Sequence, residues 1–148
     1  KAVASNPQAK LVAVADAFEK AANDLAEAYG CEVRSIDQIE KASDIDAVVI
    51  CTPTDTHADL IERFVLAGKA VFCEKPIDLD VARVEKCLGV VEKAGGTLMV
   101  GFNRRFDPHF AAVRKAIDDG AIGKVEQVVI TSRDPGPPPA EYITRSGG

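Results

Sequence analysis

Several residue types are scarce in this chain of 148 residues, and each scarcity excludes a class of protein. The chain has no Trp, only two Tyr and a formal net charge of −5, so it lacks the basic surface and aromatic platforms of a nucleic-acid-binding protein. No apolar run approaches the about 18 residues of a membrane span, and the first residues lack the apolar stretch of a signal peptide. We therefore predict a cytoplasmic protein that binds neither nucleic acid nor a membrane.

Cysteine and histidine are too few and too scattered for a structural metal. The four cysteines stand at positions 31, 51, 73 and 87 without a Cys-x-x-Cys pair, and only His57 and His109 could join them. Zinc sites need clustered ligands, so we predict no metal. Buried free thiols, acting as small core residues in a reducing compartment, are the favoured interpretation.

Short apolar runs are the main positive feature of the chain. They span residues 11–15, 47–51, 70–73 and 97–100, and they are continuous, as expected for parallel strands buried on both faces. A brief strand is also predicted near Val33. Helical spacing separates these runs, and 47% apolar residues suffice for one core. The pattern predicts an α/β fold with a doubly wound parallel (Rossmann) sheet.

The helices are predicted from their ends and their apolar stripes. The starts are a capping-box pattern at Thr56, a second start at Ser35, the pair Asp107-Pro108 and a helix near Glu19, while Gly68 and Gly120 mark two ends. Two stripes are predicted to face the core, and they consist of Leu60, Ile61, Phe64 and Val65, and of Val81, Val84, Leu88 and Val91.

The last segment has a different pattern. Residues 125–131 mix polar and apolar positions, which predicts a strand in a sheet with one solvent-exposed face. Residues 134–139 are predicted to form a proline-rich extended loop. A domain boundary near residues 120–123 would explain the change. We therefore predict a nucleotide-binding domain over residues 1–122 and the first strand and loop of a second α+β domain over residues 123–148.

Polar residues follow each predicted buried strand. They are Asp16, then Thr52-Pro53-Thr54, then Glu74-Lys75-Pro76, then the segment from Gly101 to Arg105. In open parallel sheets, ligands bind at the carboxyl ends of the strands, so the four groups predict one site.

Each candidate also has a structural interpretation. Asp16 could accept hydrogen bonds from both hydroxyls of an adenosine ribose, which favours NAD over NADP, or it could cap the helix near Glu19. His57 is interpreted as a first-turn surface histidine rather than a base. Lys75, held extended by the following proline, could bind a substrate hydroxyl or could pair with Glu74 on the surface. Of Arg104 and Arg105, one could bind ligand.

Three motifs in order resemble those of a known family. CEKPID at residues 73–78 follows TPTDTH at 52–57 and precedes GFNRRFDP at 101–108. This resembles the NAD(P)-dependent sugar and polyol dehydrogenases that include glucose-fructose oxidoreductase and the inositol dehydrogenases. Within the family, the resemblance is greatest to enzymes that oxidise the cyclitol myo-inositol to 2-keto-inosose with NAD.

The resemblance implies roles for individual residues. Lys75 would be the catalytic lysine at the nicotinamide and would contact the substrate, with a Lys-Pro bond that is often cis in the family, and Glu74 and Pro76 would shape the cofactor pocket. Asp16 would hold the ribose, and Thr52 and Pro53 would pass under the cofactor. Asn103 with Arg104 would face nicotinamide and substrate, and Asp134 would contact a cyclitol hydroxyl. The resemblance also implies a homo-oligomer, a tetramer.

Two family features have no match in these residues. The glycine-rich turn G-x-G-x-x-G is absent, and so are the Asp and His that follow a Gly-Gly in the family. We therefore expect an internal fragment, inactive by itself, whose sheet of order 3-2-1-4-5-6 lacks strand 1 and leaves two neighbouring strand edges unpaired. The alternatives are another sugar or polyol dehydrogenase of the family, a non-catalytic nucleotide-binding domain, and a structural fragment.

Overall fold

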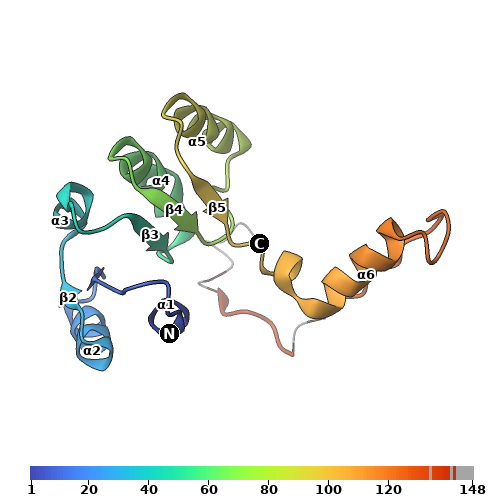
Figure 1. The fold of residues 1–148 in the computed structure, drawn as a ribbon, viewed down its shortest axis with the longest axis horizontal. Coiled ribbons are helices and arrows are strands. Elements are labelled where there is room, and N and C mark those ends of the chain that lie inside the picture. The colour runs from blue at the N-terminus through green and yellow to red at the C-terminus, as the bar shows by residue number, and fades with distance from the viewer. Residues whose placement is uncertain (134, 141, 143–148) are drawn as a thin grey trace.

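Strands and helices alternate along the chain, as the apolar runs predicted (Figure 1). The computed structural model describes residues 1–133, 135–140 and 142. The helices are α1 (Ala2–Ser5), α2 (Glu19–Tyr29), α3 (Ile36–Lys41), α4 (His57–Leu66), α5 (Val81–Lys93) and α6 (Pro108–Asp118), with 3₁₀ turns η1 (Thr54–Thr56) and η2 (Asn103–Phe106). The strands are β1 (Ala13–Val14), β2 (Glu32–Val33), β3 (Ala47–Ile50), β4 (Ala70–Cys73) and β5 (Leu98–Val100).

The strands form two parallel sheets. In one, β1 pairs with β2; in the other, β4 lies between β3 and β5. Within the described residues, β1 pairs only with β2 and β3 pairs only with β4, so each has an unpaired edge. The prediction of two unpaired strand edges is thereby confirmed, and so is the α/β class with parallel strands. Ala13 of β1 packs against the core of the three-stranded sheet.

The core lies on one face of the three-stranded sheet. Alternate residues of β3 and β4 are buried against α4 and α5, and these residues are Val48, Ile50, Val71 and Cys73. The residues between them point to the other face, where Val49 is 53% exposed and Met99 of β5 is 43% exposed. The prediction that the strands are buried on both faces is therefore wrong for the described residues, since only one face is covered.

The stripe predicted on α4 is confirmed, and the one on α5 is wrong in part. Ile61, Phe64 and Val65 are buried, and Leu60 is half-buried against the same core. On α5 the helix instead turns Cys87 and Val91 inward, while Val81 and Leu88 are exposed. The small Cys87 side chain lets α5 lie close to α4, and its Sγ donates to the carbonyl of Ala58 at 3.7 Å.

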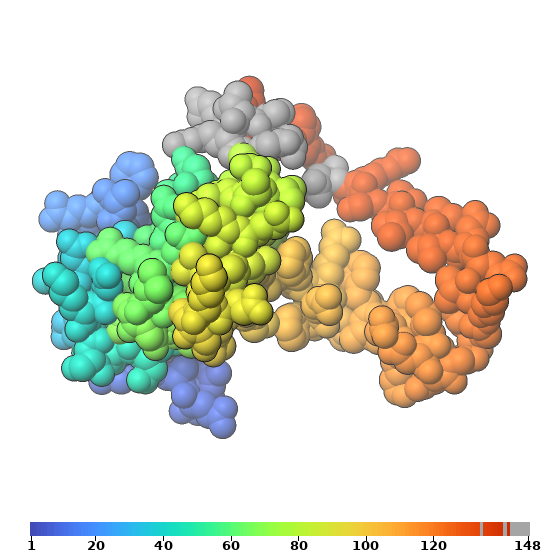
Figure 2. Space-filling view, turned by 90° about the horizontal axis from the view of Figure 1, so that it is seen from above, coloured from blue at the N-terminus to red at the C-terminus, as the bar shows by residue number. Residues whose placement is uncertain are grey.

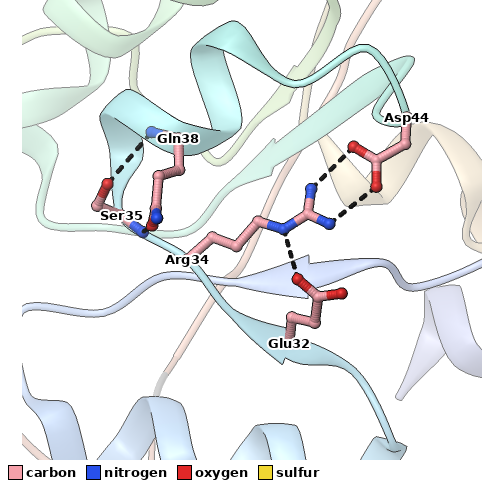
Figure 3. A network of polar contacts seen from close by, with 5 residues as sticks. All are labelled: Glu32, Arg34, Ser35, Gln38 and Asp44. Carbon is pink, nitrogen blue, oxygen red and sulfur yellow. Dashed lines mark hydrogen bonds and ion pairs between the residues drawn. The ribbon is translucent and has the colours of Figure 1, made fainter.

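All four predicted helix starts are confirmed in position, including that of α2 at Glu19, but the capping box predicted at Thr56 is wrong. Ser35 and Gln38 form a reciprocal capping box at the start of α3 (Figure 3), and the Asp107 carboxylate accepts from the first amides of α6. Thr56 makes no such cap, because its hydroxyl donates to the carbonyl of Pro53 at 2.7 Å and closes η1 instead.

The predicted ends of α4 and α6 are confirmed. Gly68 and Gly120 have φ angles of +76° and +70°, in the left-handed region that residues with a side chain rarely adopt. Each glycine follows the last turn of its helix and lets the chain leave it.

Residues 125–131 have no regular secondary structure and are exposed, so the strand predicted there is not found among the described residues. A strand needs a partner strand for its amides and carbonyls, and this segment has none among the described residues. Figures 1 and 2 show α6 leading away from the sheets and the chain after it turning back toward them.

An ion-pair network joins β2 to the segment after α3 (Figure 3). The Arg34 guanidinium binds both oxygens of Asp44 at 2.8 Å and the carboxylate of Glu32 at 2.8 Å. The pKa of Asp44 is lowered by its hydrogen bond with this guanidinium. A shallow depression lined by these residues contains none of the candidate site residues, so we interpret the network as structural.

Lys69 is expected to contribute strongly to stability, because it is a buried ammonium group. Its side chain is 5% exposed, and its Nζ donates to the carbonyls of Ala42 at 2.7 Å and Ile45 at 2.9 Å. Replacing Lys69 by Met would leave both carbonyls without this donor and should lower the free energy of unfolding by about 2 kcal/mol. The control Lys41→Met, at an exposed position of α3, should change it by less than about 0.5 kcal/mol in the same urea titration. Equal effects of the two substitutions would contradict this role.

Candidate active site

Three of the four predicted polar groups lie at one edge of the three-stranded sheet. Thr52 and Pro53 follow β3, the segment from Glu74 to Pro76 follows β4, and Asn103 lies in η2 just after β5. Since β3, β4 and β5 are parallel, their carboxyl ends share this edge. The structure therefore brings these residues together as the sequence predicted.

The segment after β4 is fixed by backbone hydrogen bonds, and the side chain of Lys75 is exposed. The amide of Glu74 donates to the carbonyl of Ile50 at 2.9 Å, which extends the pairing with β3 by one residue. The Lys75-Pro76 peptide bond is cis, as the resemblance implied. Lys75 is exposed, and the described residues contain no ion pair between it and Glu74. The alternative interpretation, in which Lys75 pairs with Glu74 on the surface, is therefore wrong.

Glu74 can lie close to the end of β5 because the residue that follows this strand is a glycine. The amide of Gly101 donates to the carbonyl of Cys73 at 2.8 Å. A Cβ atom on Gly101 would stand 3.3 Å from the carboxyl carbon of Glu74 and 3.2 Å from the ring of Phe72, tighter than ordinary contact. Gly101 therefore makes room for Glu74, a role that sequence reasoning missed although a glycine directly after a strand was its signal.

His57 was interpreted as a surface histidine, and this interpretation is wrong. Its side chain is 1% exposed at the start of α4. Its Nδ1 lies 2.7 Å from the carbonyl oxygen of Pro76, and its Nε2 lies 2.7 Å from that of Thr52. The ring thus joins the segment after β3 to the segment after β4. The TPTDTH motif gave no signal for this burial, because the second partner of the ring, Pro76, lies 19 residues further along the chain.

The residues after β5 divide between the site and α6. The amide of Asn103 donates to the carbonyl of Gly101 at 2.9 Å, which keeps Asn103 at the strand end. The guanidinium of Arg104 stands 5.3 Å from the centre of the Phe110 ring, in a cation–π contact with α6. The Arg104 side chain therefore packs against α6. Among the described residues, no contact is found between Arg104 and Lys75.

Asp16 lies at the end of β1, in the two-stranded sheet. Its carboxylate accepts a hydrogen bond from the amide of Phe18 at 2.8 Å, and Phe18 is the residue that precedes α2. The predicted capping role is wrong in detail, because Asp16 binds the amide before the helix instead of one within its first turn. Its side chain is otherwise exposed. Asp134 lies outside the described residues.

The described residues contain neither a metal-binding cluster nor a helix that could cross a membrane. In that part of the chain, no three side chains of His, Cys, Asp or Glu are grouped so that they could hold a metal ion. None of the helices that can be described combines the length and apolar character needed to cross a bilayer.

The thiol pKa values of two cysteines at this edge are raised by their surroundings. Burial raises the pKa of the Cys73 thiol to about 12. Burial also raises the pKa of the Cys51 thiol, with a second contribution from the negative charge of Glu74. Cys73 is fully buried and Cys51 is exposed, so the interpretation of the cysteines as buried core residues holds for Cys73 and Cys87 and is wrong for Cys51.

Alkylation of the thiols should follow their exposure to solvent. With iodoacetamide at mildly alkaline pH, Cys51 should react in the folded protein, while Cys73 and Cys87 should react only after unfolding. Glu74→Gln removes the charge that disfavours the Cys51 thiolate, so the pKa of Cys51 should fall and its alkylation should become severalfold faster. The control Glu85→Gln, on the exposed face of α5, should leave the rate unchanged, which peptide mapping by mass spectrometry measures. An unchanged rate in Glu74→Gln would contradict the proximity of the two groups.

Comparison with known proteins identifies relatives over the whole chain. A family model described as the oxidoreductase family with an NAD-binding Rossmann fold matches residues 1–102. The chain is 74% identical over 148 residues to an inositol 2-dehydrogenase of Rhizobium meliloti, covering 100% of this chain and 45% of that protein.

Solved structures of inositol dehydrogenases are also similar to this chain. A myo-inositol dehydrogenase of Corynebacterium glutamicum is 48% identical, with a TM-score of 0.91 over 99% of this chain and 44% of that chain. A scyllo-inositol dehydrogenase of Lactobacillus casei, solved with NAD(H) and scyllo-inositol, is 34% identical, with a TM-score of 0.77 over 82% of this chain and 37% of that chain. The present chain thus spans less than half the length of each of these relatives.

Proposed function

Because this chain belongs to the oxidoreductase family with an NAD-binding Rossmann fold, we propose that its protein oxidises a secondary alcohol of a cyclitol to a ketone with NAD. The proposed reaction is the conversion of myo-inositol to 2-keto-inosose. The observation that carries the proposal is the exposed Lys75, which stands between the ends of β3 and β5 on a segment with a fixed backbone. The similarity to an inositol 2-dehydrogenase supports the choice of substrate.

The residues at the strand ends suit a dinucleotide. Asp16 presents a carboxylate at the end of β1 that can accept from the ribose hydroxyls, since the Phe18 amide uses only part of its acceptor capacity. Thr52 and Pro53 form an exposed surface after β3 on which the cofactor can lie. Bound NAD would supply the acceptor for a hydride leaving the alcohol carbon.

Lys75 is proposed to bind the reacting hydroxyl. Its ammonium group has three N–H donors and no acceptor, so it can hold the alcohol oxygen and stabilise the negative charge that develops there as the hydroxyl proton leaves. It is assigned this assisting role, and general base catalysis is assigned to a histidine outside these 148 residues. Glu74 and Pro76 would shape the pocket around it.

The remaining candidates are assigned to binding. Asn103 is proposed to face the nicotinamide from the end of β5. Arg104 and Asp134 are proposed to contact substrate hydroxyls, and for Arg104 this requires its guanidinium to leave the Phe110 ring. We also propose the division into residues 1–122 and 123–148 from the change in sequence pattern, a cytoplasmic location from the composition, and a homotetramer from the family resemblance.

The experiment that tests the function is a substrate panel with the protein as its gene encodes it. NADH formation should be measured with myo-inositol, scyllo-inositol, glucose and a buffer control. The proposal expects kcat/KM to be highest for an inositol. Activity confined to glucose would select another sugar dehydrogenase of the family, and NAD binding without turnover of any polyol would select a non-catalytic nucleotide-binding domain.

Cofactor choice should depend on Asp16. Its carboxylate would bind the ribose hydroxyls and repel a 2′-phosphate, so Asp16→Ser should raise the KM for NAD about tenfold and bring the kcat/KM values for NAD and NADP closer together. The control Asp24→Ser, at an exposed position of α2, should leave both values unchanged. An unchanged ratio of the two cofactors in Asp16→Ser would remove Asp16 from the proposed site.

A further inference from the structure

His57 has two hydrogen-bond partners of the same kind. Nδ1 lies 2.7 Å from the carbonyl oxygen of Pro76, and Nε2 lies 2.7 Å from the carbonyl oxygen of Thr52. Both distances are those of good hydrogen bonds. A carbonyl oxygen only accepts, so each ring nitrogen must donate a proton for both bonds to exist.

A neutral imidazole cannot satisfy this arrangement. It carries one N–H, so its second nitrogen would face a carbonyl oxygen lone pair against lone pair. The ring is 1% exposed, and water therefore has little access to separate the two atoms. An imidazolium has an N–H on each nitrogen, and both would be used. Burial disfavours a charged ring, and no ion pair with a carboxylate is found for it among the described residues, so the two charge-assisted hydrogen bonds must offset the loss of hydration.

The two carbonyls belong to the segments that form the candidate site. Thr52 directly follows Cys51 at the end of β3, and Pro76 directly follows Lys75 at the end of β4. The carbonyl of Pro76 therefore belongs to the residue bonded directly to Lys75. A contact that fixes Pro76 relative to Thr52 therefore also sets where Lys75 stands relative to the Thr52-Pro53 surface.

We propose that His57 is a positioning residue of this site, and that it acts as an imidazolium whose two N–H groups bind the carbonyls of Thr52 and Pro76. It touches neither substrate nor cofactor. It holds the two segments at one separation, so that the Lys75 ammonium meets a hydroxyl bound over Thr52 and Pro53. The positioning role rests on the proposed function, whereas the protonation of the ring does not.

The protonation is tested by NMR on the wild-type, gene-encoded protein labelled with ¹⁵N at histidine. The two-bond ¹H–¹⁵N correlations should be recorded at mildly alkaline pH, where free imidazole is neutral. Spectra of His109→Gln identify the signals of the second histidine of this chain. The expected result is a ring with both nitrogens protonated for His57. A pattern with one protonated and one bare nitrogen overturns the imidazolium.

The positioning role is tested by His57→Gln, whose amide has donors on only one side and cannot donate to both carbonyls. We expect kcat to fall about 10²-fold, because a small displacement of a catalytic group has such an effect. The deuterium isotope effect on kcat should also rise, because the chemical step becomes slower than product release. His109→Gln, at an exposed position of α6, is the matched control and should retain wild-type kcat.

The outcomes separate this inference from the proposed function. A wild-type kcat per folded His57→Gln molecule overturns the positioning role, with the folded fraction measured by circular dichroism. The same holds if only Tm falls and the isotope effect stays constant, because a purely structural residue would behave in this way. Inactivity of the wild-type protein on every polyol would overturn the proposed function, whereas the NMR result would still decide the state of the His57 ring.

Discussion

Replacing Lys75 by Met should lower kcat/KM for the cyclitol about 10³-fold while leaving NAD binding within a factor of about three. Met keeps the length of the side chain and removes its N–H donors, so the substrate oxygen would lose the positive group that stabilises it. The loss should be mainly in kcat, since the interaction strengthens as negative charge develops on the oxygen. Steady-state NADH formation and a fluorescence titration with NAD measure the two quantities.

The matched control for this substitution is Lys86→Met, at an exposed position of α5 away from the strand ends. It removes the same charge and should retain wild-type kcat/KM. Lys75→Arg should remain impaired, because the planar guanidinium is larger and holds its donors in a different geometry. Wild-type activity in Lys75→Met would exclude Lys75 from the chemistry.

Alanine substitutions at two glycines should have opposite effects on stability. An added Cβ at Gly96, in the turn before β5, would clash with Cγ1 of Val65, which is buried and branched and cannot easily move. Gly96→Ala should therefore lower the free energy of unfolding by about 2 kcal/mol. Gly89 lies within α5 with nothing near its missing Cβ, so Gly89→Ala should raise it by about 0.5–1 kcal/mol.

The comparison between these two variants removes the general effect of replacing glycine by alanine. Urea titrations of the gene-encoded protein should give midpoints on opposite sides of the wild-type value. If Gly96→Ala were as stable as Gly89→Ala, the close approach of the turn before β5 to α4 would be contradicted.

The sequence predicted the parallel strands and most helix ends because these depend on local patterns. The residues of β4 were predicted with their observed bounds, since a short apolar run flanked by a glycine and a charged pair has few alternatives. Ser35 and Gln38 form their capping box within four residues of each other, so distant packing does not disturb it.

The predictions that were wrong concern residues whose conformation depends on contacts with distant parts of the chain. Thr56 has the capping pattern, but its hydroxyl binds Pro53 because η1 brings that carbonyl close. Leu88 fits the helical period, but the packing of α5 on α4 places the smaller Cys87 inward. His57 could not be predicted as buried, because its two partners are 5 and 19 residues away and lie on different strand ends.

The candidate site was predictable as a set of strand ends and less predictable in its contacts. Strand ends of a parallel sheet share an edge whatever the side chains are, so the grouping of Thr52, Lys75 and Asn103 followed from the topology. The contacts of Glu74 with Gly101, and of Arg104 with Phe110, depend on turns after β5 that no periodicity describes.

The central proposal is that this protein removes a hydride from a cyclitol carbon and transfers it to NAD. The most direct test supplies the gene-encoded protein with myo-inositol deuterated at the carbon that becomes the ketone, together with NAD, and analyses the NADH by mass spectrometry. The account predicts NADH that carries the deuterium and a ketone product that has lost it. NADH without deuterium, or no NADH from this or any other inositol, would contradict it.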